Sequence, residues 1–212
     1  MTDKAERRKF LKAALTAMAG TGTIATTSCI SAMCYVPAPP VVQPEYTILS
    51  KGKKQVVVVC RSMDTNLSDI PRDIARRVGD VIHVNTKNKK LEVVKADVVN
   101  AWLDNCNDVF DDFLDVGRDK MIAADYVIGI ELIGYQLCDP HTPHLLQGKA
   151  KLQVYAFDCK SGETVANRTV DVIFPSNVPM TTGPGVDQAF RSQFVQIVSE
   201  RIANLFVPHH SR

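Results

Sequence analysis

The sequence predicts a single α/β domain with a mixed sheet of about five strands, covered by helices mainly on one face. Apolar runs at 54–60, 91–94 and 125–137 alternate with segments that repeat apolar residues every three or four positions. Two further strand-like segments, 147–158 and 164–174, then follow each other directly, before a long amphipathic segment. The expected order of elements is therefore β-α-β-α-α-β-β-β-α.

The run 125–137, DYVIGIELIGYQL, is expected to form the central strand. It is rich in Val, Ile, Leu and Tyr and contains no Pro, which favours a strand that is buried over most of its length. Glu131 interrupts the apolar run, and a charge in that position needs a partner or water.

Helices are expected at 68–82, 96–106 and 111–123, between the first strands. The first of them carries one apolar stripe with four-residue spacing, formed by Ile70, Ile74, Val78 and Ile82. Because strands and helices alternate in this half of the chain, the strands should be parallel and joined by right-handed crossovers.

The second half of the chain predicts an antiparallel arrangement. Strands 147–158 and 164–174 are joined by the tight turn Lys160-Ser161-Gly162-Glu163. Residues 175–185 are rich in Pro and Gly and should form a loop. The segment 187–207 should form the closing amphipathic helix.

The formal net charge of +2 comes from the amino-terminal segment. Residues 1–28 hold five of the 25 basic residues and two of the 23 acidic ones, so the remainder has 25 − 5 = 20 basic and 23 − 2 = 21 acidic residues. A body with a net charge of −1 offers no electrostatic argument for nucleic-acid binding.

Residues 1–28 are expected to be an export signal. Arg7 and Arg8, followed by Phe10 and Leu11, closely resemble a twin-arginine signal, although Glu6 stands where Ser or Thr is usual. The Ala-, Thr- and Gly-rich stretch that follows is too short and too weakly apolar for a permanent membrane span.

The four residues Thr26-Thr27-Ser28-Cys29 resemble a lipobox, in which Cys29 would be lipidated and become the first mature residue. Thr26 departs from the pattern, and an exported protein without lipid is the alternative. Residues 29–45, with several prolines, should form a tether to a globular domain at 46–208. Residue 30 is Ile and not the Asp that often retains lipoproteins at the inner membrane. This favours the outer membrane, with the domain facing the periplasm.

The segment 138–144 concentrates metal-ligand residue types in Cys138, His141 and His144, beside Asp139. The alternative is a polar hairpin loop bent by two prolines. No cofactor is expected otherwise. The other cysteines form no CxxC pair, and Cys60, Cys106 and Cys159 are expected to be structural thiols. Cys138 and Cys159 should lie at opposite ends of a hairpin, too far apart for a disulfide.

The sheet itself offers a candidate partner-binding face. Residues of alternating polarity in the last strands place polar side chains on one side, with Glu131 expected near Lys151 or Gln153. This face should not be fully covered by helices; a solvated face without a partner is the alternative. The candidate residues are Glu131, Lys151, Gln153, Tyr155 and Thr169.

Two short sequence segments resemble those of a known family, and the resemblance extends over about residues 50–207. They are Ala123-Ala124-Asp125-Tyr126-Val127-Ile128, and Gln147-Gly148 opening a strand that ends before Ser161-Gly162-Glu163. The chain resembles bacterial envelope lipoproteins with a domain similar to the TolB amino-terminal domain, such as the curli-secretion lipoprotein and activators of penicillin-binding proteins. The resemblance implies an α/β fold and an envelope location.

The expected function is that of a non-enzymatic envelope lipoprotein that binds or positions a protein or cell-wall component. The chain contains no GxSxG, Walker A or GxGxxG motif. The alternatives are a small exported metal-binding protein that uses Cys138, His141 and His144, and a homo-oligomer assembled through a sheet edge.

Overall fold

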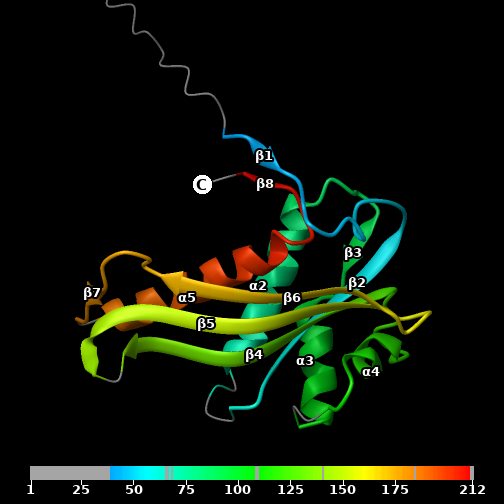
Figure 1. Cartoon of the computed structure of the whole chain (residues 1–212). Helices are drawn as coiled ribbons and strands as arrows, with labels where there is room; N and C mark the ends of the chain where they lie inside the picture. The colour runs from blue at the N-terminus through cyan, green and yellow to red at the C-terminus, as the bar shows by residue number, and fades with distance from the viewer. Residues whose placement is uncertain are drawn as a thin grey trace, which may run out of the picture. The chain divides into compact units, whose positions relative to one another are not determined.

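A six-stranded mixed sheet organises the domain. The computed structural model describes residues 39–64, 67, 69–107, 110–139, 141–183 and 185–210. Its main strands lie in the order β3-β2-β4-β5-β6 (Figure 1), and β7 pairs with the start of β5. The strands are β2 (Lys54–Ser62), β3 (Leu91–Val93), β4 (Tyr126–Asp139), β5 (Thr142–Asp158), β6 (Thr164–Phe174) and β7 (Met180–Thr181). The predicted α/β domain and the central position of β4 are confirmed.

The sheet is parallel in its first half and antiparallel in its second. β2 runs parallel to both β3 and β4, whereas β4, β5 and β6 form an antiparallel meander. The change occurs at β4, because the chain leaves that strand through a tight turn instead of a helix.

The two long helices pack on one face of the sheet, and two shorter helices cover part of the other face. The long helices α2 (Asp69–Asn85) and α5 (Val186–Ala203) share one face, and α3 (Ala96–Asn105) and α4 (Phe113–Arg118) lie on the other. The reason is the strand order. The chain moves outward from β2 to β3 and then back past β2 to β4, and right-handed crossovers in opposite directions place their helices on opposite faces.

Two apolar cores follow from the alternation of side chains along β2. Val56 and Val58 point to the face of α2 and α5, whereas Val57 and Val59 point to the face of α3 and α4; none is more than 5% exposed. A strand that is buried on both faces reads as a continuous apolar run, as this one does. Each buried valine contributes roughly 1.5–3 kcal/mol relative to an exposed one.

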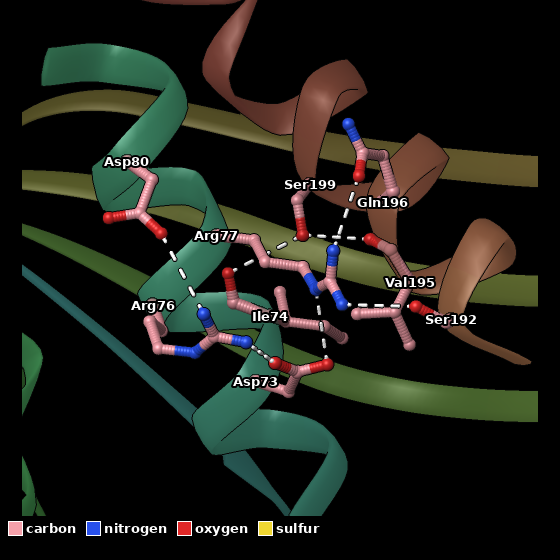
Figure 2. A network of polar contacts seen from close by, with 9 residues as sticks. All are labelled: Asp73, Ile74, Arg76, Arg77, Asp80, Ser192, Val195, Gln196 and Ser199. Atoms are coloured by element: carbon pink, nitrogen blue, oxygen red, sulfur yellow. Dashed lines mark hydrogen bonds and ion pairs between the residues drawn. The ribbon is translucent and has the colours of Figure 1, made fainter. Parts of the chain in front are cut away.

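Helices α2 and α5 approach closely at Ser199, a fully buried side chain. Its hydroxyl donates to the carbonyl of Val195 at 2.8 Å and lies 3.5 Å from the carbonyl of Ile74 across the interface (Figure 2). Nearby, Arg77 of α2 bonds to Ser192 and Gln196 of α5, with donor–acceptor distances of 3.1 and 3.2 Å. The small side chain of Ser199 therefore allows α2 and α5 to approach closely, and Arg77 links the two helices at the edge of this contact.

Helix α4 is shorter than the predicted helix 111–123. The Asp112 carboxylate caps its first turn by accepting the Leu114 N–H at 2.9 Å. The helix ends at Arg118, and the chain turns back through Ala123, whose φ is +45°. This turn brings Asp125 to the start of β4, which a helix continued to Ala123 could not do.

Other details also differ from expectation. β5 begins at Thr142, so the β4–β5 connection is a tight turn, and the loop 175–185 contains β7. Helix α5 ends at Ala203 instead of 207. Within the expected tether, Val41–Val42 forms β1 and pairs with β8 (His209–His210).

Candidate functional site

The outward side chains of β4, β5 and β6 form an exposed surface, here called the open face, beyond the area covered by α3 and α4. It comprises Glu131, Ile133, Lys151, Gln153, Thr169, Asp171 and Ile173. Ile133 and Ile173 are 57% and 55% exposed. The inner residues of the same strands, such as Leu152 and Val170, are buried against α2 and α5. The prediction that helices leave this sheet face partly uncovered is confirmed.

Glu131 meets its partner on the parallel side of the sheet. Arg61, its neighbour in register on β2, donates to Oε1 of Glu131 through Nη2 at 2.9 Å and Nε at 3.2 Å. The two side chains are 29% and 18% exposed, so the pair is partly shielded from water. This shielding strengthens the attraction and raises the cost of losing one partner.

Arg61 also fastens the segment that leads into α4. Its Nη1 donates to the carbonyls of Phe110 at 3.2 Å and Asp111 at 3.1 Å, and its guanidinium lies 4.7 Å from the ring centroid of Phe113. Arg61 thus marks the border between the covered and open parts of the face. Arg61 was not among the residues predicted from the sequence; the signal that could have indicated it is a charged residue directly after the apolar run 54–60.

An aromatic wall completes that border. The ring of Phe113 packs over Gly129 and lies 6.2 Å from the rings of Tyr155 and Phe157. Tyr155 is half-buried in this group. It therefore lies at the edge of the open face, and its ring serves mainly to hold α4 on the sheet.

Gln153 links the two antiparallel strand pairs. It lies opposite Glu131 on β4 and Thr169 on β6, so the expected proximity of Glu131 and Gln153 is confirmed. Thr169 Oγ1 donates to Gln153 Oε1 at 2.7 Å, and Gln153 Nε2 donates to the side-chain oxygen of Asn167. Lys151 lies opposite Gly134 and Asp171 instead of Glu131.

The open face therefore holds its polar groups in fixed positions on a sheet. It combines Glu131, Lys151 and Asp171 with uncharged polar residues and two exposed isoleucines. A surface that mixes polar and exposed apolar side chains is compatible with contact with a macromolecule.

Cys138, His141 and His144, the residues of the metal-site hypothesis, lie in and next to the β4–β5 turn. Within residues 39–210 as described, no three His, Cys, Asp or Glu side chains gather in a group that could hold a metal ion. β4 continues through Cys138, which pairs with Leu146, and β5 begins at Thr142. Metal binding by these three residues stays a prediction.

The cysteines with described positions are free thiols. Cys60 and Cys159 are buried, and Cys106 and Cys138 are half-buried. Burial raises the pKa of the Cys159 thiol to about 11, which disfavours the reactive thiolate. Cys159 follows the end of β5 while Cys138 lies near its start, as the hairpin argument predicted.

The export and lipidation residues Arg7, Arg8, Phe10, Leu11 and Cys29 lie outside the described residues. In the part of the chain that the structure describes, no helix has both the length and the hydrophobicity needed to cross a bilayer.

No protein-family model matches the sequence, and no curated protein matches it. The chain is similar to the PelC dodecamer structure from Paraburkholderia phytofirmans, with 13% identity over 77% of this chain and 96% of that one, and a TM-score of 0.42. It is similar to lipoprotein GNA1162 from Neisseria meningitidis, with 13% identity, 69% and 98% coverage and a TM-score of 0.41. It is also similar to the LpoB C-terminal domain from Escherichia coli, with 14% identity over 57% of this chain and 82% of that one, and a TM-score of 0.34. Similarity at these levels supports no statement about function.

Proposed function

We propose that the protein is a non-enzymatic lipoprotein of the bacterial cell envelope that binds a protein or cell-wall partner through the open face. The observation that carries the proposal is the open face of β4, β5 and β6, which the helices leave uncovered. There, a fixed polar row formed by Glu131, Gln153 and Thr169 lies on the same face as exposed Ile133 and Ile173. Isolated aliphatic side chains within a polar frame can act as anchors for a partner.

The anchor is proposed from the amino-terminal segment. The twin-arginine pattern would direct export, and acyl chains on Cys29 would hold the protein in the membrane, since each buried methylene contributes about 0.8 kcal/mol. Residues after Cys29 would then act as the tether that places the domain in the periplasm, at the outer membrane. Mass spectrometry of the mature amino-terminus tests this part: diacylglyceryl on Cys29 supports it, and an unprocessed Met1 overturns it.

The partner-binding part is tested by site-specific photo-crosslinking of the full chain in its native cells. A photoreactive residue at Lys151 or Thr169 should give discrete adducts, whereas one at exposed Gln193 on α5 serves as the matched control. Adducts should include a protein of reproducible mass or fragments of cell wall. Equal labelling from all three positions, or none from the open face, would contradict the proposal.

A charge substitution adds specificity to the same test. Ile173→Arg should abolish the adduct formed from Thr169, because it places a charge among the proposed anchors. Val84→Arg is the control, since Val84 is an equally aliphatic and 77% exposed side chain on α2. Loss of the adduct in both variants would show that the effect does not belong to the open face.

A further inference from the structure

A crevice opens at the edge of β2, where β3 ends early. β3 pairs only with Lys54–Val56 of β2, although β2 continues to Ser62. Beyond this point α2 and α3 flank the edge from opposite faces of the sheet. The crevice between them has a volume of about 230 Å³, and its lining includes Val58 and Cys60 of β2.

The position of this crevice follows from the topology. β2 continues into α2 on one face, while its neighbour β3 continues into α3 on the other. Where connections from adjacent parallel strands leave in opposite directions, a cleft remains outside the carboxyl ends of the strands, and α/β proteins commonly bind ligands there.

The edge of β2 presents backbone groups to the crevice. The Val94 N–H donates to the Val56 carbonyl at 2.9 Å, so Val56 directs its backbone groups towards β3. The direction of the backbone N–H and C=O groups alternates from residue to residue along a strand. The backbone groups of Val58 and Cys60 therefore point to the same side as those of Val56, beyond the point where β3 ends. Among the described residues no hydrogen bond reaches them from that side. An extended ligand could therefore continue the ladder where β3 stops.

The lining adds an apolar floor, with the basic residue Lys95 at the mouth. Val58, Val99 and Leu103 are buried apolar side chains on the floor. Arg76 is ion-paired with Asp73 and Asp80 on its own helix, and Lys95 is an exposed positive side chain at the mouth. Arg72 is held across the mouth by Asp104 on α3, with 2.7 Å between Nη2 and Oδ1, and this bond connects the two walls.

From these features we infer that the crevice binds the carboxy-terminal end of an extended peptide that has an apolar last residue. The backbone edge of β2 would pair with the peptide amides, the apolar floor would take the last side chain, and Lys95 would attract the terminal carboxylate. A volume of 230 Å³ corresponds to roughly eight water-sized groups, enough for one such residue with its carboxylate.

Calorimetric titration of the full chain tests the inference with three probes: N-acetyl-alanyl-alanyl-valine, its carboxy-terminal amide, and N-acetylvaline. The tripeptide acid should bind at least about tenfold more tightly than either of the others, a difference of about 1.4 kcal/mol. Equal binding of the amide would overturn the role of the carboxylate, and equal binding of N-acetylvaline would overturn pairing with β2. Absence of binding would overturn the site.

Variants locate the binding in the crevice. Ala75→Leu fills it and should abolish binding, whereas Ala101→Leu on the exposed side of α3 should leave affinity unchanged. Lys95→Gln should weaken binding of the acid but not of the amide, with exposed Lys89→Gln as its control. Thermal unfolding of each variant confirms that it is folded. Unchanged affinity in Ala75→Leu, or equal losses in Lys95→Gln and Lys89→Gln, would contradict the inference.

Discussion

The ring of Phe113 lies directly over Gly129, so close that a Cβ at position 129 would come within 2.6 Å of the ring. This contact seats α4 on the sheet and fixes where the open face begins. Gly129→Ala should therefore destabilise the domain by about 2 kcal/mol or more, because the ring and its helix must shift. Chemical denaturation measures the free energy of unfolding.

The matched control lies on the same strand. A Cβ at position 134 would meet nothing within 4 Å, so Gly134→Ala should change the free energy of unfolding by less than about 0.5 kcal/mol. Equal costs at the two positions would show that the effect comes from β4 itself and not from the contact with Phe113.

The Arg61–Glu131 pair is expected to act as a unit. Arg61→Met should cost about 2 kcal/mol, since it leaves a partly buried carboxylate and two backbone carbonyls without their donor. In the double variant with Glu131→Gln, the loss should be smaller than the sum of the two single losses. Additive losses in this double-mutant cycle would contradict coupling between the two side chains.

The lowered pKa of Asp125 predicts a defined pH dependence of the free energy of unfolding. The Gln55 N–H at 3.0 Å and, secondly, Lys160 hold the pKa of this carboxyl below its usual value. A group with a lowered folded-state pKa stabilises the fold above its unfolded-state pKa of about 3.9, and this contribution disappears as pH falls through the folded-state value.

The test compares the wild type with Asp125→Asn. The variant should be less stable by about 1 kcal/mol at pH 7, where the charged hydrogen bond is present. The difference should begin to shrink below about pH 5 and continue to do so as the pH falls further. A difference that stays constant from pH 7 to about pH 2 would show that the charge of Asp125 is not its cause.

Removal of the hydroxyl group from Tyr135 and from Tyr46 should change the free energy of unfolding in opposite directions. The Tyr135 hydroxyl is buried without a hydrogen-bond partner among the described residues, and burial raises its pKa to about 12. Tyr135→Phe should therefore stabilise the domain by up to about 1 kcal/mol. The Tyr46 hydroxyl donates to the Asn167 carbonyl at 3.3 Å, so Tyr46→Phe should destabilise it slightly. A large loss of stability in Tyr135→Phe would reveal a partner for that hydroxyl.

Much of the fold could be predicted because it depends on local patterns. The continuous apolar run before Arg61 specified a strand buried on both faces, and β6 has the predicted bounds, Thr164–Phe174. The polar alternation of β5 and β6 correctly placed Gln153 and Thr169 on one uncovered face. These patterns report the periodicity of side chains, which is a property of each segment alone.

The sequence by itself therefore determined the five main strands, the long helices and the polar side of the sheet. Only the tertiary structure decided that β3 lies outside β2, and with it the placement of helices on both faces and the crevice between α2 and α3. Strand order also gave Glu131 its partner Arg61, 70 residues away in the chain. Periodicity shows which side of a strand is buried, but not which strand becomes its neighbour, because that choice depends on packing between distant segments.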